Sequence, residues 1–516
     1  MTQERRPNIL HILTDQQRFD TIHALGNAHI RTPALDRLVR EGTTFTNAFT
    51  PSPVCVPARC SMIYGQYPLR TACTENWDMP ADGRQSLMDV LTAAGYRTHG
   101  VGKCHFMPDM EAGRGFESRE SQEGWVTDPA RDDYVRSLRE EGYDAHVRPF
   151  GAGGSMYYIP QPSVVAPVHH QDSWVATRSS AFLSEQAGGA RPWYLFCSFL
   201  SPHPPFCPPR PWHQMYHPLL MPLPKTPPNS EALLTWVHAF QNRYKFRDAG
   251  TDLHLLRTIR AYYYAGISYV DYLVGTLLSQ LEEAGQLDNT LVLFTSDHGE
   301  YLGDYGCYGK RGMHDVSARV PLLCRLPGRF AAGARVSTPA SLVDVLPTFA
   351  SAAGATLASH APDGVDLAAL ARGDVRRDTV FSQYDEGDMA IFMAATERWK
   401  YIYSVADRRE YLFDRLLDPE ETRNVADNGI RNGVTAVLRE RTHGHIRESG
   451  GEERYLDGKH WRAYETQTVH RAWKWWPMRP PRETAWNPDS GFLMGPYTDP
   501  GLPEGYQVPD SDGGTL

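Results

Sequence analysis

The sequence predicts an α/β fold, in which a large, mainly parallel sheet is flanked by helices and followed by a smaller α+β unit. Two observations predict it: apolar runs that end in polar residues alternate with amphipathic helical segments, and the composition changes near residue 375. Because 516 residues exceed what one compact core usually holds, we expect a large domain over 1–375 and a small one over 376–450. Residues 451–516, rich in Trp and Pro, predict an extended tail that packs on the body or on a neighbouring subunit of a homo-oligomer.

Four segments have the pattern of buried parallel strands: residues 7–16, 96–103, 192–203 and 289–300. Each apolar run opens into polar residues at its carboxyl end. Parallel sheets bind ligands beyond these ends, so we expect polar side chains far apart in the sequence to meet at one edge. The residues concerned are Asp15, Lys103, His105, His203, Asp297 and His298.

Helices are predicted over residues 32–42, 85–95, about 251–285 and 341–354, with a further helix near 432–445 in the smaller unit. In the first, Thr32 at the N-cap, Pro33 in the first turn and Gly42 at the end mark both limits. In the third, apolar residues recur at spacings of three and four, which is the pattern of an amphipathic helix.

Composition excludes several classes of protein. A net charge of −9 argues against a nucleic-acid partner, because phosphate binding needs clustered Lys and Arg. No segment approaches the roughly 20 apolar residues that span a bilayer. The N-terminus runs almost at once into a strand and leaves no room for a signal peptide, so we expect a cytoplasmic protein. The eight cysteines are scattered without zinc-ligand spacing, which predicts free thiols.

One of these thiols has unusual surroundings. In SPVCVPARCSM, residues 52–62, Cys55 lies between two prolines. Pro57 is expected in the first turn of a helix that ends at Gly65, which places Cys55 just ahead of that helix. Free N–H groups and the helix dipole favour an anion there, and Arg59 can point back from one turn later. Such a thiol is more acidic than usual, whereas the alternative is a small apolar residue at a proline-bounded turn.

The segment CVPAR resembles the Cys-x-Pro-x-Arg signature of the formylglycine-dependent (type I) sulfatases of the alkaline phosphatase superfamily, and CSMIYGQYP continues the pattern. The resemblance covers roughly residues 7–430 and is nearest the choline-sulfatase and phosphonate monoester hydrolase branches. It implies that residues 1–375 form the catalytic domain of a sulfuric ester hydrolase. It also implies that a formylglycine-generating enzyme oxidises Cys55 to an aldehyde.

Further segments of this sequence resemble the metal-binding segments of that family. TDQ supplies Asp15 and Gln16, and SDHGE supplies Asp297 and His298. Together with residue 55 they imply a site for a hard divalent cation, calcium first, with magnesium or manganese as alternatives. Most relatives have two aspartates where this chain has Asp15-Gln16.

The remaining site residues also follow from the resemblance. GKCH places Lys103 and His105 at the ester group, SPHPPF supplies His203, and Lys310 resembles the last active-site lysine. Asn76 either fills a polar, substrate-binding position near the nucleophile or is a plain loop residue.

The mechanism implied by the resemblance begins with a metal-bound diol at residue 55, one hydroxyl of which attacks sulfur. Arg59, Lys103 and Lys310 neutralise the sulfate oxygens. His203 or Lys310 protonates the leaving alcohol, and His105 takes the proton of the second hydroxyl as sulfate leaves.

Two other functions stay open. The same scaffold could hydrolyse a phosphonate monoester or a phosphodiester, although the Lys-x-His of GKCH favours sulfate. Alternatively, the chain is a non-catalytic metal-dependent binding protein in which Cys55 stays a thiol. The alcohol of the expected small-molecule or saccharide sulfate ester is not readable, although Trp125, Asp385 and Glu386 could form part of its binding wall.

Overall fold

The structure is a computed structural model that describes residues 6–124, 131–143, 149–151, 157–238, 241 and 252–464. Trp125 and most of the predicted tail lie outside these ranges, so the packing of the tail and the oligomer stay predictions. Residues 451–464, which the composition groups with the tail, form the short helix α13 and the hairpin β15-β16.

The predicted large sheet is confirmed, and it has eight strands in the order β5-β4-β6-β1-β7-β8-β2-β9. The strand β8 runs antiparallel to both neighbours, and every other adjacent pair is parallel. The four predicted strands lie side by side at its centre. The bounds are β1 Asn8–Thr14, β2 Thr43–Phe45, β4 Arg97–Gly102, β5 Ser118–Ser121, β6 Trp193–Phe199, β7 Thr290–Ser296, β8 Leu322–Arg325 and β9 Ala334–Val336.

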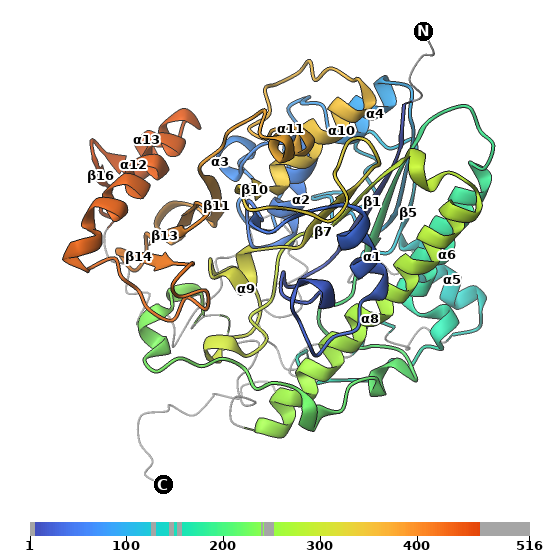
Figure 1. Ribbon diagram of the computed structural model, residues 1–516, viewed down its shortest axis with the longest axis horizontal. Helices are drawn as coiled ribbons and strands as arrows, with labels where there is room; N and C mark the ends of the chain where they lie inside the picture. Colours follow the sequence, from blue (N-terminus) through green and yellow to red (C-terminus); the bar gives the residue numbers. More distant parts are fainter. Residues whose placement is uncertain are drawn as a thin grey trace, which may run out of the picture.

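Two layers of helices cover the faces of this sheet (Figure 1). One face packs against α2 Cys55–Tyr64, α4 Leu87–Ala93, α10 Val345–Ala353 and α11 Leu367–Arg372. The other packs against α1 Pro33–Glu41, α6 Gln171–Glu185 and the long helix α8 Leu253–Glu283. In β1, Ile9 and Leu13 enter the first core whereas Leu10 and Ile12 enter the second, so the strand is apolar on both sides.

The predicted helices are all present, but one of them ends for a different reason. Gly42 follows α1, as expected, but its φ of −129° is not the left-handed conformation that glycine often adopts at the end of a helix. A Cβ at Gly42 would overlap the carbonyl oxygen of Cys324 in the neighbouring strand β8. The glycine is therefore needed for close packing and not for a backbone conformation.

The smaller unit is built on a four-stranded antiparallel sheet, drawn at the left of Figure 1. Leu438 and Ile446 of the helix α12 Asn432–Glu448 pack on one face of this sheet. The other face packs on the loop after β7, where Ile391 and Ile402 share a core with Tyr301. The sheet therefore supports that loop by packing against it. The predicted domain limits near 375 and 450 stay predictions. The strands are β11 Val380–Tyr384, β12 Ile391–Ala395, β13 Trp399–Ser404 and β14 Arg409–Asp414.

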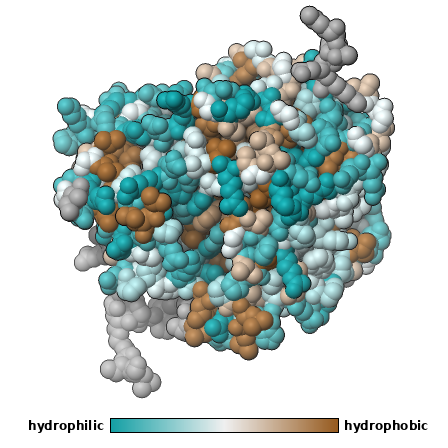
Figure 2. All heavy atoms as spheres, in the orientation of Figure 1, coloured by the Kyte–Doolittle hydropathy of each residue, from teal (hydrophilic) through white to brown (hydrophobic). Residues whose placement is uncertain are grey.

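Shorter elements complete the described fold. They are α3 Pro68–Thr71, α5 Asp133–Glu140, α9 Asp315–Ala318, α13 Glu452–Tyr455, β3 Ala48–Phe49, β10 Ala340–Ser341, β15 Leu456–Asp457 and β16 His460–Trp461. Among the described residues, no helix combines the length and the apolar character needed to cross a membrane. The face shown in Figure 2 is mostly hydrophilic, with hydrophobic side chains gathered in separate small areas.

A matched pair of glycines tests how tightly the central strands pack. Gly102 ends β4 with φ 93°, and a Cβ there would overlap the carbonyl oxygen of Ser198 in β6. Gly95 has a similar φ of 88° but open space around it. We expect Gly95→Ala to cost about 1 kcal/mol of unfolding free energy, and Gly102→Ala to cost about 2–3 kcal/mol more because neither backbone can yield easily. Denaturant unfolding measures both, and equal losses would contradict this account.

Candidate active site

The polar residues that follow the central strands lie together at one edge of the sheet. The strands β4, β6, β1 and β7 are consecutive neighbours and run parallel, so their carboxyl ends are adjacent. Asp15 follows β1 directly, Lys103 follows β4, and Asp297 follows β7. His203 lies four residues beyond the end of β6, at Phe199. Each of these side chains is buried.

Cys55 reaches this edge on the helix α2. It is the first residue of that helix, not the residue ahead of it as predicted, because the extended backbone of an N-cap falls at Val54. The left-handed Gly65 ends the helix, as expected. Asn76 accepts a hydrogen bond of 2.9 Å from the backbone N–H of Val56. The side chain of Asn76 therefore satisfies a free N–H in the first turn of α2.

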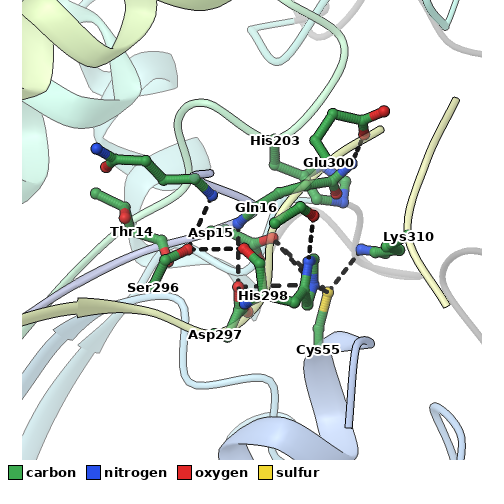
Figure 3. A network of polar contacts seen from close by, with 12 residues as sticks. Thr14, Asp15, Gln16, Cys55, His203, Ser296, Asp297, His298, Glu300 and Lys310 are labelled. Atoms are coloured by element: carbon green, nitrogen blue, oxygen red, sulfur yellow. Dashed lines mark hydrogen bonds and ion pairs between the residues drawn. The ribbon is translucent and has the colours of Figure 1, made fainter. Parts of the chain in front are cut away.

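Cys55 lies among three groups that could bind a metal ion. Four buried residues each offer one possible ligand atom, and these atoms all lie within 4.8 Å of one another (Figure 3). The residues are Asp15, Cys55, Asp297 and His298. The sulfur of Cys55 is 3.3 Å from Nε2 of His298 and 3.7 Å from Oδ1 of Asp15. The sequence predicted these four residues as one site, and the fold brings them together from β1, α2 and β7.

Gln16 also belongs to this group. Its backbone N–H donates to Oδ1 of Asp297 at 3.0 Å, and its side-chain amide nitrogen donates to Glu300. The amide oxygen of Gln16 is buried and accepts no hydrogen bond from any residue in the described part of the chain. A buried oxygen without a donor, on the residue next to Asp15 and bonded through its backbone to Asp297, fits a cation ligand.

Two lysine ammonium groups face Cys55. Nζ of Lys310 lies 2.8 Å from its sulfur. Nζ of Lys103 lies 3.9 Å from the sulfur and 2.7 Å from Oδ2 of Asp15. The two lysines come from different loops, after β7 and β4, and both bring positive charge to residue 55.

Arg59 has a different position from the predicted one. Its guanidinium was expected to point back towards Cys55, but it binds the two carboxylates, at 3.2 Å from Oδ2 of Asp15 and 2.9 Å from Oδ2 of Asp297. It also donates to the carbonyl oxygen of Lys103 and to Oγ of Ser198. Arg59 therefore connects α2 to the carboxyl ends of all four central strands, β1, β4, β6 and β7.

These neighbours control the pKa of the Cys55 thiol. Burial would raise this pKa, but Lys103, Lys310 and His298 outweigh burial, and the nearby ring of His105 adds to their effect. The pKa of the thiol consequently lies well below its ordinary value of 9.0. The sequence analysis predicted an acidic thiol because of the helix N-terminus. The thiol is acidic, but the cationic side chains around it are the main cause.

The two predicted histidines both lie near residue 55. His105 is buried in a left-handed turn with φ 55°, and neither ring nitrogen has a hydrogen-bond partner among the described residues. Nδ1 of His203 lies 2.7 Å from the carbonyl oxygen of Pro204. Burial and the nearby Lys310 lower the pKa of His203, so its ring is neutral near pH 7.

Sequence reasoning missed two carboxylates that hold the site. Glu123 accepts hydrogen bonds from the backbone N–H groups of Cys104, at 3.2 Å, and of His105, at 2.8 Å, and it forms an ion pair with Arg119. Glu300 accepts from Gln16 and from Gly309, the residue before Lys310. The motif SDHGE contains Glu300 but gives it no role, and no local pattern points to Glu123.

Two of the residues suggested for a substrate wall have partners elsewhere in the protein. The backbone N–H of Asp385 donates to the carbonyl oxygen of Thr74 at 2.9 Å, which ties the C-terminal sheet to the segment that contains Asn76. Glu386 forms an ion pair of 3.0 Å with Arg454. Trp125 lies outside the described residues.

Comparison with known proteins decides the family. The family model described as Sulfatase matches residues 7–355, which is more than half of the chain. The chain belongs to the sulfatase family. A second model, described as N-sulphoglucosamine sulphohydrolase, C-terminal, matches residues 303–448. The resemblance that the motifs indicated is thereby confirmed, and with it the expected sulfatase activity of the chain.

Individual relatives support this sulfatase assignment. The chain is 33% identical over 446 residues to the choline-sulfatase of Rhizobium meliloti, which covers 82% of this chain and 83% of the relative. It is 27% identical over 503 residues to the arylsulfatase of Clostridium perfringens, covering 90% and 99%. The phosphonate monoester hydrolase of Agrobacterium radiobacter superposes with a TM-score of 0.75 at 27% identity, covering 86% of this chain and 96% of that one.

The charge environment of Cys55 can be tested in unmodified, metal-free protein. Lys310→Met removes an ammonium 2.8 Å from the sulfur, so we expect the pKa of the thiol to rise by about 1–3 units. Thiolate absorbance in the ultraviolet, followed against pH, measures the shift. Lys225→Met is the control, because Lys225 is exposed and pairs with Glu420. An unchanged thiol pKa in the Lys310 variant would contradict the assigned geometry.

Proposed function

We propose that this sulfatase hydrolyses the sulfate ester of a small alcohol, using a formylglycine made from Cys55 and a bound divalent cation. Choline sulfate is the first candidate substrate, because the choline-sulfatase of Rhizobium meliloti is 33% identical over most of both chains. A saccharide sulfate is the alternative. One observation carries the proposal: the sulfur of Cys55 lies within 4 Å both of possible metal ligands, Asp15 and His298, and of the ammonium groups of Lys103 and Lys310.

The residues present fit a hard divalent cation. Asp15 and Asp297 supply carboxylate oxygens, Gln16 supplies an amide oxygen without a donor, and His298 supplies one imidazole nitrogen. Oxygen-rich sets of this kind suit calcium, with magnesium or manganese as alternatives that elemental analysis separates. When bound, the cation polarises an ester oxygen and makes a hydroxyl at residue 55 more acidic.

Residue 55 needs maturation for this chemistry. A formylglycine-generating enzyme would convert the Cys55 side chain to an aldehyde, whose hydrate supplies the attacking hydroxyl. The surroundings suit an anionic nucleophile, because the same cations that lower the pKa of the thiol stabilise negative charge at this position. The buried first turn of α2 holds the group in a fixed orientation.

The remaining residues take roles that follow from their positions. Lys103 and Lys310 neutralise charge on the sulfate oxygens, since each ammonium lies within 4 Å of residue 55. Lys310 donates the proton to the leaving alcohol, because the lowered pKa of His203 leaves few of its rings with a second proton to give. His105, whose ring nitrogens have no partner among the described residues, accepts a proton at residue 55 as sulfate is released.

A second candidate activity is hydrolysis of a phosphonate monoester or a phosphodiester. The similarity in structure to the phosphonate monoester hydrolase of Agrobacterium radiobacter favours it. Both esters present anionic oxygens to the same cations. Comparing kcat/KM for choline sulfate, sugar sulfates, an aryl sulfate and a phenyl phosphonate monoester ranks the two activities, and we expect a sulfate ester to rank first.

Peptide mass spectrometry tests the maturation step. In protein produced together with a formylglycine-generating enzyme, we expect the peptide of residues 51–59 to lose sulfur at Cys55. Cys60 is the internal control, because it lies on the same helix α2, equally buried, and should stay a thiol. An intact thiol at Cys55 in that preparation would sink the proposal and favour the non-catalytic metal-dependent binding protein.

Substitution of the two groups assigned to proton transfer tests their roles. We expect Lys310→Ala and His105→Ala each to lower kcat by about 100-fold or more. Their thermal melting should stay close to that of the wild type, because neither side chain is part of a hydrophobic core. Lys225→Ala should keep full activity. Turnover near the wild-type rate in either active-site variant would refute its assigned role.

A further inference from the structure

Glu300 is a buried carboxylate at the active site to which the mechanism above gives no role. We propose that Glu300 is a positioning residue: it turns the amide oxygen of Gln16 towards the bound cation and couples that ligand to the loop that carries Lys310. The inference rests on the proposed cation site. Both oxygens of Glu300 are engaged, and the residue lies beside Gln16 and His298 in Figure 3.

The first step concerns the orientation of the Gln16 amide. The NH₂ of Gln16 donates to Oε2 of Glu300, since an amide nitrogen only donates and the carboxylate oxygen accepts. The amide oxygen then faces away from Glu300, where it is buried and accepts nothing from the described residues. Such an oxygen is costly unless a ligand occupies it. A cation beside Asp15 and Asp297 is the ligand that fits.

The second step concerns what the other contacts of Gln16 leave undetermined, which is the orientation of its side-chain amide. The backbone of Gln16 is held at both ends: its N–H donates to Asp297 at 3.0 Å, and its carbonyl oxygen accepts from the hydroxyl of Tyr263 at 2.7 Å. A carboxylate at position 16 would present an oxygen in either orientation, whereas an amide presents its oxygen in only one of two. A glutamine ligand therefore needs a partner that accepts its NH₂, and Glu300 is that partner.

The third step links this ligand to Lys310. Oε1 of Glu300 accepts from the backbone N–H groups of Leu302, at 2.9 Å, and Gly309, at 2.5 Å. The backbone N–H of Tyr301 donates to the carbonyl oxygen of Gly309 at 2.8 Å, so the loop is closed next to Lys310. One carboxylate thus sets both a metal ligand and the ammonium that lies 2.8 Å from the sulfur of Cys55.

A double-mutant cycle on metal binding tests the inference without using activity. Calcium, magnesium and manganese are titrated by calorimetry into metal-free, unmodified wild-type protein and into Glu300→Gln, Gln16→Asp and the double variant. We expect Glu300→Gln alone to weaken binding about 10-fold to 100-fold, because an amide at 300 can donate to Oε1 of Gln16 and turn it away from the cation. With Asp at position 16 there is no amide to orient, so Glu300→Gln should then weaken metal binding by less than about 2-fold.

A control variant and a fallback variant separate a specific effect on the Gln16 amide from a general loss of folding. Glu410→Gln, which changes a carboxylate paired with Arg439 in the C-terminal sheet, should bind metal like the wild type. If Glu300→Gln does not fold, Glu300→Asp keeps an acceptor at a shorter reach and should bind metal more weakly than the wild type, with Gln16→Asp again removing the difference. Wild-type affinity in Glu300→Gln, or an equal loss in both backgrounds, would overturn the inference alone. A wild type that binds none of the three cations would overturn it together with the proposed metal site.

Discussion

The active site depends on one buried interaction, the guanidinium of Arg59 lying between the carboxylates of Asp15 and Asp297. All three groups are removed from water, so each is stable only while its partners stay in place. Because Arg59 lies one turn after Cys55 on α2, the same ion pairs that satisfy the carboxylates fix the start of the helix. The position of residue 55 at the sheet edge thus follows from the pairing of charges.

The balance of charge around residue 55 then explains what the site can bind. In the unmodified protein, Lys103 and Lys310 stabilise a thiolate, and Arg59 satisfies the two carboxylates. In the proposed mature protein, a neutral hydrate in place of the thiolate and a divalent cation would leave an excess of positive charge. An anionic ester would reduce that excess, so substrate binding and the alignment of residue 55 would depend on the same groups.

Much of this arrangement could be predicted from the sequence, because the ends of parallel strands must be neighbours. Asp15, Lys103, His203 and Asp297 were predicted to converge for that reason, and the motifs supplied their chemistry. The direction of β8 could not be predicted, since an apolar run has the same pattern in either orientation.

Other features depend on contacts between distant segments. The partners of Arg59 lie 44 and 238 residues away, so its turn from Cys55 towards the carboxylates has no local signal. The same is true of Glu300, whose bond to Gln16 spans 284 residues. Glu123 is closer in the sequence to its partners, but these are the backbone N–H groups of Cys104 and His105, which no sequence pattern identifies.

The most direct test is a crystal structure of protein matured by a formylglycine-generating enzyme and grown with calcium, with an anomalous difference map at the sheet edge. The account predicts a single peak bounded by oxygens of Asp15, Gln16 and Asp297 and by the ring of His298, in contact with an oxygen on residue 55. A map with no peak among these residues, or a metal bound elsewhere with residue 55 unmodified, would contradict it.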